Sequence, residues 1–469
     1  MKTKKQIYSK ITLLLSLLLV VTIGCESERA LSEDVVLATF SPSPDVYIDG
    51  FSSGLEYYPY LNSKFEAFSV DTEEKYKGSS SMRFDVPVEG DPAGAYAGAI
   101  FRDDNGGRNL TQYDALTFWA KATQSAKIND IGFGQDFGEN KFEVSKRGLQ
   151  LTTNWVKYVI PIPDASRLIQ EKGLLWYAEG PENGEGYSFW IDEVKFEKLG
   201  TISDIEALIL EGDDKVITSF NGVQTTIDGV SATFNFTDQI SQTISISPAY
   251  LTFNSSNTSV ATVDDFGVVT TLESGTAVIT ASFNDQQVSG SLTINSLGAF
   301  SHAPIPTQDP ANVISLFSDA YTNVPVNYYN GYWAPWQTTL SDDFTVDGDN
   351  ILQYTIFNFV GVEFSSPTVD ATSMSHFHLD AYIPGPIAPG RQLRVLLVDF
   401  GADGAYGGGD DTRHSTTFTA PTLVSQNWIS IDLPFSSLTG LDSRSNLAQL
   451  ILEGGDGSKI FIDNLYFYN

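Results

Sequence analysis

The fold is decided by two stretches of alternating residues, Ala115-Leu116-Thr117-Phe118-Trp119-Ala120 and Trp155-Val156-Lys157-Tyr158-Val159-Ile160-Pro161-Ile162. Alternation of this kind is typical of β-strands that bury one face. Similar stretches recur along the 469 residues, separated by Gly, Asn and Asp turns, and long helical periods are few. A chain of this length exceeds a single hydrophobic core. We therefore predict an all-β protein of about three domains.

Two regions of the chain repeat the same segments in the same order. Phe189-Trp190-Ile191-Asp192-Glu193-Val194 in the first region matches Ile460-Phe461-Ile462-Asp463-Asn464-Leu465 in the second. Several matches in one order are hard to obtain by chance, so we interpret the regions, 45–199 and 313–469, as modules from a divergent duplication. The other matched segments are 130–138 with 396–401, 154–161 with 427–434, and 175–180 with 450–454.

The region between the modules has a different pattern. It contains Ser255-Ser256-Asn257-Thr258-Ser259-Val260-Ala261-Thr262-Val263-Asp264, followed by Gly267-Val268-Val269-Thr270. These segments resemble the bacterial Ig-like group 2 domain, which implies an Ig-like β-sandwich over residues 200–297. The alternating strands of this region carry no aromatic cluster, so we expect a rigid spacer. Residues 298–312, which include His302-Ala303-Pro304-Ile305-Pro306, are expected to form a linker.

Both modules resemble the jelly-roll carbohydrate-binding modules through their last matched strand. The C-terminal one resembles the module found beside laminarinases and in surface glycan-binding proteins of Bacteroidetes. This likeness rests on segments 313–326, 359–364, 397–401, 407–412 and 461–468. The resemblance implies two jelly-roll β-sandwich modules flanking the Ig-like β-sandwich, and a β-1,3-glucan such as laminarin as the polysaccharide ligand. It also implies two kinds of partner, an outer-membrane glycan importer and neighbouring glycoside hydrolases.

Residues 328–336, Tyr-Tyr-Asn-Gly-Tyr-Trp-Ala-Pro-Trp, form what we call the aromatic loop. Gly331 and Pro335 interrupt any regular pattern, so the segment is predicted to be a loop that displays its rings for stacking on sugars. The alternative, that these rings are local core, stays open. The candidate ligand-binding residues are Trp333, Trp336, Tyr332, Tyr329 and Tyr328 in this loop, Asp410, Asp411, Arg413 and His414 in and beside a Gly-rich turn, and Tyr57, Tyr58 and Trp176 in the first module.

The resemblance also implies a structural Ca²⁺. In the jelly-roll family an Asp of the last strand helps to hold the ion beside the first strand. Asp192 and Asp463 occupy that place here, and Asp49 and Asp319 lie near the first strands of the two modules. Carboxylate oxygens suit this hard cation. Aspartates that cap turns without a metal are the open alternative, and no other cofactor is expected.

Charge and the missing signatures limit the function. The net charge of −31 repels nucleic acid and favours a neutral ligand. No recognisable pair of catalytic carboxylates, Gly-x-Ser-x-Gly elbow, P-loop or His-Glu-x-x-His occurs. We therefore expect no catalytic residue and a glycan-binding protein that is not an enzyme. Two alternatives stay open: an adhesin or structural surface protein that binds proteins, and a glycoside hydrolase with unrecognised catalytic residues.

The N-terminus carries a targeting pattern. A basic start is followed by the apolar run Ile11–Ile23, which is too short to span a bilayer. The run ends in Val21-Thr22-Ile23-Gly24-Cys25, which resembles a bacterial lipobox. That likeness implies a signal peptide over 1–24, lipidation of Cys25, an acidic and Pro-containing tether over 25–44, and a lipid-anchored protein at the outer-membrane cell surface. An ordinary signal peptide with a chance cysteine is the alternative.

Overall fold

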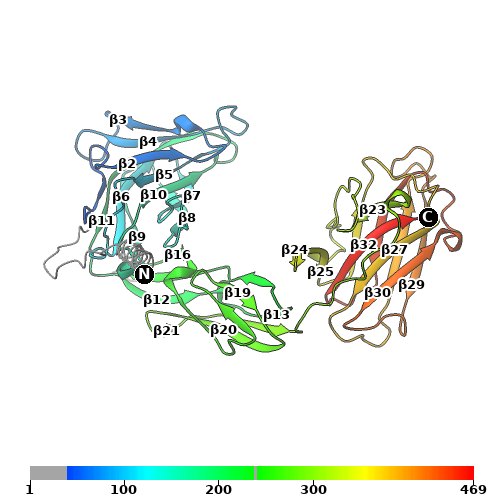
Figure 1. Ribbon diagram of the computed structural model, residues 1–469. Helices are drawn as coiled ribbons and strands as arrows, with labels where there is room; N and C mark the ends of the chain where they lie inside the picture. Colours follow the sequence, from blue (N-terminus) through cyan, green and yellow to red (C-terminus); the bar gives the residue numbers. More distant parts are fainter. Residues whose placement is uncertain (1–39, 237–239) are drawn as a thin grey trace, which may run out of the picture. The chain divides into compact units, whose positions relative to one another are not determined.

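The computed structural model describes residues 40–236 and 240–469 and is all-β, as predicted. Cys25 and the leader lie outside the described residues. The chain divides into two compact units, one with residues up to 140 and 147–200, the other with 141–146 and 201–469. We describe each unit by itself (Figure 1). Among the described residues, no helix has the length and hydropathy needed to cross a membrane.

The N-terminal module is built from two sheets. A six-stranded sheet has the order β3-β4-β11-β6-β9, with β1 also paired to β11, and the second sheet has the order β2-β5-β10-β7-β8. Phe84, Phe101 and Tyr177 come from both sheets and pack their rings together in the core. The strands are β1 (Asp45–Tyr47), β2 (Leu55–Pro59), β3 (Phe68–Asp71), β4 (Ser81–Val86), β5 (Ala97–Asp103), β6 (Ala115–Ala122), β7 (Ala126–Phe133), β8 (Val144–Leu151), β9 (Val156–Pro161), β10 (Gly173–Glu179) and β11 (Tyr187–Glu197).

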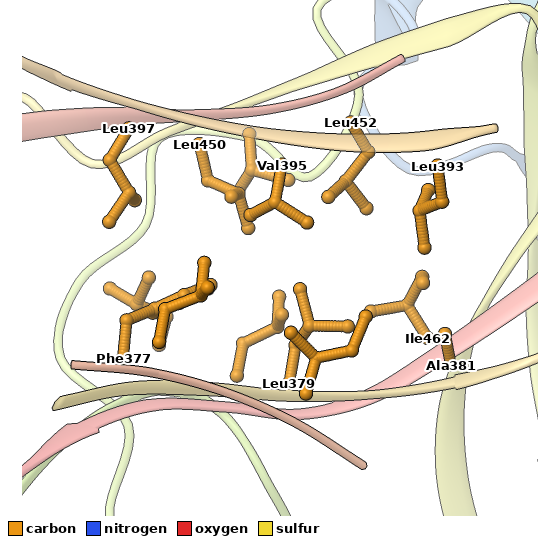
Figure 2. Packing of buried hydrophobic residues seen from close by; sticks show 14 of the residues in the cluster. Phe377, Leu379, Ala381, Leu393, Val395, Leu397, Leu450, Leu452 and Ile462 are labelled. Atoms are coloured by element: carbon orange, nitrogen blue, oxygen red, sulfur yellow. The ribbon is translucent and has the colours of Figure 1, made fainter. Parts of the chain in front are cut away.

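The C-terminal module is a second two-sheet sandwich. Its six-stranded sheet has the order β24-β25-β32-β27-β30, with β23 paired to β32, and its four-stranded sheet has the order β26-β31-β28-β29. Figure 2 shows side chains of the two sheets pointing toward one another, among them Leu379 of β27 and Val395 of β28. The strands are β23 (Val313–Phe317), β24 (Leu340–Val346), β25 (Asp349–Thr355), β26 (Phe359–Glu363), β27 (His376–Tyr382), β28 (Leu393–Asp399), β29 (Thr412–Phe418), β30 (Trp428–Pro434), β31 (Leu447–Glu453) and β32 (Ile460–Tyr468).

The two modules share one topology, as a duplication requires. Each of the four matched sequence segments falls on a strand with the same place in its sheet: β7 with β28, β9 with β30, β10 with β31, and β11 with β32. The last strands even share a bulge, at which Glu193 and Asn464 both have φ of 51°. Such a conformation costs energy for residues other than Gly, and in both strands the preceding Asp accepts the N–H of the bulged residue, at 2.7 and 2.6 Å.

Between the modules lie the short sheets of the Ig-like region. One has the order β13-β22-β20-β17 with β21 paired to β20, another the order β14-β19-β18, and β12 pairs with β15, which pairs with β16. The strands are β12 (Ser203–Leu208), β13 (Asp214–Ser219), β14 (Gln224–Thr226), β15 (Ser231–Phe236), β16 (Ile240–Ile246), β17 (Thr252–Ser255), β18 (Ala261–Val263), β19 (Val268–Thr271), β20 (Gly275–Phe283), β21 (Gln286–Gln287) and β22 (Ser291–Ser296).

Residues 298–312, expected as a linker, are held against the C-terminal module. Phe300 is buried in an aromatic cluster with Phe344 and Phe461 of that module. Phe220, which follows β13 of the Ig-like region, packs in the same cluster, 4.8 Å from Phe300 between ring centroids. Lys459 also donates to the Thr218 carbonyl, at 3.3 Å. Because buried side chains fix this junction, the segment is not a free linker.

Candidate functional site

The four-stranded sheet of the C-terminal module turns a row of side chains away from the core. Leu450 and Leu397 point inward (Figure 2), so their strand neighbours Ile451 and Leu396 point outward. Ile451 is paired with Gly361 on one side and with Leu396 on the other. Outward apolar residues on adjacent strands give this face a hydrophobic floor.

 A cavity of about 570 Å³ lies over this floor. This volume is large enough for one or two sugar rings, and the cavity walls combine aromatic rings with polar groups. Trp333 stands on one side and Tyr406 on the other. The lining residues are Trp333, Glu363, Leu396, Val398, Tyr406, Asp411, Arg413, Gln449 and Ile451. A concave apolar surface with a few polar groups is the usual form of a small-ligand site.

Trp333 is held in the wall by two glycines. A Cβ at Gly361 would lie 2.4 Å from the indole ring, and a Cβ at Gly331 would lie 2.3 Å from its Nε1. Real side-chain atoms do not approach so closely, so both positions need glycine for the ring to lie where it does. Its backbone N–H also donates to Gln337 Oε1, at 3.2 Å. The ring is therefore positioned before any ligand arrives.

Glu363 supplies a fixed negative charge at the cavity. Its carboxylate accepts hydrogen bonds from Tyr328 at 2.6 Å, from Ser365 at 2.7 Å and from Gln449 at 3.0 Å. Burial alone would raise the pKa of Glu363, but these three hydrogen bonds outweigh it and hold the pKa below its usual range. The group is ionised at neutral pH and can accept hydrogen bonds.

The loop that follows β28 forms the opposite wall. Asp410 accepts the N–H of Ala402 at 2.7 Å, and Asp411 accepts the N–H of Gly407 at 2.9 Å through Oδ2. The second oxygen of Asp411, Oδ1, is buried and has no hydrogen-bond partner among the residues that the structure describes. Since an unmatched buried oxygen is costly, this atom is a ready acceptor for a ligand hydroxyl in the cavity that Asp411 lines.

Only some of the candidate ligand-binding residues of the C-terminal module lie at the cavity. Trp333, Asp411 and Arg413 line the cavity, and Tyr328 acts on it through Glu363. Asp410 braces the loop instead. His414 follows Arg413 on β29, so it lies on the other face of that strand, where it accepts the Gly440 N–H at 3.1 Å.

The other three rings of the aromatic loop do not line this cavity. Tyr329 packs against the core and donates to the Leu316 carbonyl at 2.8 Å, so for this ring the core alternative holds. Tyr332 and Trp336 are exposed, Trp336 by 74%. Their rings are open to solvent on the same loop, beside the cavity wall that Trp333 forms.

In the N-terminal module the candidates have different surroundings. Tyr57 packs its ring on Phe68 and Phe101, at 5.1 and 5.3 Å between centroids. Tyr58 points outward and donates to Asp104 at 2.5 Å. The expectation that Trp176 is open is wrong, because this residue is only 5% exposed and its indole N–H donates to the Phe133 carbonyl at 3.3 Å.

The calcium candidates of the N-terminal module act as turn caps. Asp192 Oδ2 accepts the N–H groups of Tyr76 and Lys77, at 2.9 and 3.0 Å, and Asp49 Oδ1 accepts those of Ser79 and Ser80. Both carboxylates therefore cap turns in this structure, and calcium binding by this pair stays a prediction.

Asp319 and Asp463 lie close together in the C-terminal module, where Asp319 also accepts the Asn350 N–H at 2.7 Å. With Asp349 they line one cavity of about 480 Å³ beside residues 302–306. Burial and the nearby charges of Asp349, Asp380 and Asp319 raise the pKa of Asp463 to about 7. Among the described residues, no group of three or more His, Cys, Asp or Glu is already arranged to hold a metal ion. The oxygen ligands suit Ca²⁺, and its binding here stays a prediction.

Several lining residues were not among the candidates. Glu363, Gln449 and Tyr406 reach the cavity from β26, β31 and the loop after β28, which are far apart in the sequence. For Glu363 and Gln449, the available signal was the alternation along their strands, which places them on the face opposite the core. For Tyr406 the only signal was its place next to the Gly-rich turn.

Two family models match parts of the chain. Residues 39–198 match carbohydrate binding domain 30, and residues 245–285 match the intimin immunoglobulin-like domain. The N-terminal module is similar to carbohydrate-binding modules. The second match supports an Ig-like domain in the middle region. No curated protein matches this chain.

Solved structures of carbohydrate-binding modules also resemble the chain. The family 11 module from Clostridium thermocellum, in complex with a β-1,3-1,4-mixed-linked tetrasaccharide, is 16% identical with a TM-score of 0.25, over 34% of this chain and 96% of that chain. A family 30 module is 13% identical with a TM-score of 0.26, over 34% and 98%. The tandem family 22 modules from Paenibacillus barcinonensis are 12% identical with a TM-score of 0.22, over 93% and 99%.

Proposed function

We propose that this chain is a non-catalytic cell-surface protein that captures a neutral polysaccharide, with a β-1,3-glucan such as laminarin as the ligand. The observation that carries the proposal is the cavity of the C-terminal module, where Trp333 stands beside an apolar floor and Asp411 Oδ1 lacks a partner within residues 40–236 and 240–469. An aromatic ring stacks on the C–H face of a sugar, and an unpaired carboxylate oxygen accepts a sugar hydroxyl. The family match of residues 39–198 supports glycan binding in general.

Charge supports a neutral ligand. The net charge of the chain is −31, and Glu363 is an ionised carboxylate at the cavity. An anionic polysaccharide would be repelled by both. Of the described residues, Arg413 is the only cationic one that lines this cavity. We therefore expect laminarin to bind and alginate, which carries carboxylates, not to bind.

The cavity is also poorly suited to glycoside hydrolysis. A glycosidase needs a general acid, a carboxyl group with a raised pKa, opposite a second carboxylate. Glu363 has the opposite property, since its hydrogen bonds hold its pKa low. Release of reducing sugars from laminarin, mixed-linkage glucan or xylan by the purified chain would overturn the non-catalytic part of the proposal.

The direct test is a matched pair of substitutions in the full-length chain. Stacking one sugar on one ring removes apolar surface worth roughly 2–3 kcal/mol before ordering costs, so Trp333→Ala should weaken laminarin binding by about 1–3 kcal/mol. Trp336→Ala, which removes an exposed ring outside the cavity, should have a smaller effect. Affinity gels with laminarin, mixed-linkage glucan, xylan and alginate measure both. Equal losses for both variants, or none for Trp333→Ala, would contradict the assignment.

We propose further that the chain is a lipoprotein of the outer surface that passes glycans to an outer-membrane importer and neighbouring glycoside hydrolases. The support is the lipobox-like sequence that ends in Cys25. Cys25→Ala should move the protein from the membrane fraction to the soluble fraction. Unchanged retention in the membrane fraction would exclude lipidation of Cys25 as the anchor. A protein partner that binds in place of any glycan would favour the adhesin alternative.

A further inference from the structure

The six-stranded sheet of the N-terminal module presents an aromatic outer face. Phe118 and Ala120 of β6 and Phe189 and Ile191 of β11 are buried in the core. Their strand neighbours therefore point outward. Three of the seven tryptophans of the chain lie on this side: Trp119 on β6, Trp190 on β11, and Trp155 just before β9. We call this surface the outer face.

The β3–β4 loop brings a fourth ring to the outer face. Asp192, which lies next to Trp119 in the sheet, accepts the N–H groups of Tyr76 and Lys77 and so fixes the loop on the strands. Tyr76 then stacks on Trp119 at 3.8 Å between centroids and 11° between planes. Trp155 lies 6.1 Å from Tyr76 and is tilted by 59°. The rings of Tyr76 and Trp155 therefore meet at an angle, and Tyr76 remains 40% exposed.

Charges on the outer face are paired. Lys121 and Arg83 flank Trp190 across adjacent strands, at 5.7 and 5.6 Å from its ring centroid. Lys121 pairs with Glu74 at 3.1 Å, and Arg83 with Asp85 at 2.9 Å. Cations that are matched in this way offer no unpaired charge to an anionic ligand.

A polar hollow adjoins the rings. It has a volume of about 480 Å³ and shares Glu74 and Arg83 with the ion pairs around Trp190. Asp71, which also lines it, accepts the Trp190 indole N–H at 2.9 Å. Trp190 itself is buried, but Tyr76 of the same face is exposed. Aromatic rings on one face with a hollow of hydroxyl, carboxylate and guanidinium groups match the two sides of a sugar, an apolar C–H face and a rim of hydroxyls.

We propose that the outer face is a second glycan-binding surface, on which a neutral polysaccharide stacks against Tyr76 and Trp155 and directs hydroxyls into the polar hollow. A protein partner fits less well, because the centre of a protein interface is depleted of charged residues, whereas here every ring has a charged neighbour. The inference rests on the proposed polysaccharide binding of the chain but uses residues that the C-terminal cavity does not contain.

The same module offers a competing surface on its other sheet. Tyr58 points outward from β2, and Phe137, which is 57% exposed, lies 5.4 Å from it. Phe137→Ala is therefore a matched control for Trp155→Ala, since it removes a partly exposed ring from the opposite side of the same module. If the glycan binds to that sheet, Phe137→Ala should weaken binding and Trp155→Ala should not.

The test uses the full-length chain with Trp333→Ala, so that the C-terminal cavity is weakened. On affinity gels with laminarin and mixed-linkage glucan, this variant should still be retarded. Adding Trp155→Ala or Tyr76→Ala should lower the remaining affinity by about tenfold, and adding Phe137→Ala should leave it unchanged. Tyr76→Phe, which keeps the stack on Trp119, should bind like its parent. Thermal unfolding of each variant separates a lost contact from a lost fold.

The outcomes distinguish this inference from the proposed function. If Trp333→Ala alone abolishes binding, the cavity is the whole site and the outer face is not one. If Phe137→Ala lowers the remaining affinity and Trp155→Ala does not, the inference is equally overturned. If Trp333→Ala has no effect while Trp155→Ala and Tyr76→Ala do, the outer face binds and the cavity assignment fails. A chain that binds neither glucan contradicts both.

Discussion

The two β-sandwich modules have the same strand order, but the outward face of the matching sheet is open in one module and covered in the other. In the C-terminal module the outward residues Ile451 and Leu396 form the floor of a cavity, and Gly361 in the same row lies under Trp333. The register-equivalent row of the N-terminal module contains Ile100 and Trp176, which are 2% and 5% exposed although they point away from the core. A duplicated scaffold therefore does not duplicate a site.

This difference in exposure comes from the loops that follow β7 and β28. After β7, Gln135 lies so close to the start of β10 that a Cβ at Gly173 would be 2.1 Å from its carbonyl oxygen. After β28, the longer loop up to Asp411 stands at the side and carries the exposed Tyr406. Strand order is set by the repeated segments, whereas access to the sheet is set by these loops.

The largest effect that the comparison predicts is on stability. Trp176→Ala removes a buried indole and should lower the free energy of unfolding by about 3–5 kcal/mol. Trp333→Ala, at a partly exposed position, should cost far less stability and mainly reduce glycan affinity. Denaturant unfolding of the two variants measures the contrast. Similar losses of stability would mean that the two rings have the same role.

A smaller effect is expected from the glycine beneath the ring. Gly361→Ala should push Trp333 out of the cavity wall, because the new Cβ would lie 2.4 Å from the indole. The expected result is a loss of laminarin affinity of up to about tenfold, with an overpacking cost of about 1–3 kcal/mol in stability. Gly385→Ala is the matched control, since its Cβ would meet nothing within 4 Å. If both variants bind equally, the ring does not depend on this space.

The third prediction concerns pH and the N-terminal module. Burial raises the pKa of Glu171 to about 8, with a further contribution from Asp136, and burial raises that of Glu179 to about 7. Both pKa values exceed the ordinary glutamate pKa of 4.5, so the folded state binds more protons than the unfolded state. The stability from these groups is complete below about pH 4.5 and is lost as pH rises through about 7–8. Unfolding of the wild type and Glu171→Gln between pH 5 and 8 should show a flatter profile for the variant; parallel profiles would refute this assignment.

The smallest expected effect is that of calcium. Ca²⁺ should raise the unfolding temperature through the C-terminal module, where Asp319 and Asp463 line one cavity, and Asp319→Asn should abolish the shift. Asp49→Asn should leave the shift unchanged, because Asp49 belongs to the N-terminal module and does not line the cavity of Asp319 and Asp463. Thermal unfolding with Ca²⁺ or with a chelator checks this. A shift that depends on Asp49 instead would reverse the comparison.

The fold was largely predictable because it depends on local sequence patterns. Alternation defined the strands, and the matched segments placed β7, β9, β10 and β11 opposite β28, β30, β31 and β32. The site was less predictable because it depends on pairing across strands. Trp333 was found from composition, but only the sheet register shows that Gly361 makes room for it. Trp176 was predicted to bind a ligand because the sequence does not show that its ring is covered in the fold.

The aromatic junction around Phe300 has a consequence for dissecting the protein. A chain cut after Ser296 would lose Phe220 from the cluster and leave Phe344, Tyr382 and Phe461 with less cover. Apolar rings uncovered in this way tend to self-associate. A C-terminal module prepared alone would then tend to aggregate. Its binding to an insoluble polymer would include nonspecific adsorption through the uncovered rings, in addition to specific recognition of the glycan. The Ig-like region thus serves as a solubilising cap for its neighbour, and the two belong in one fragment.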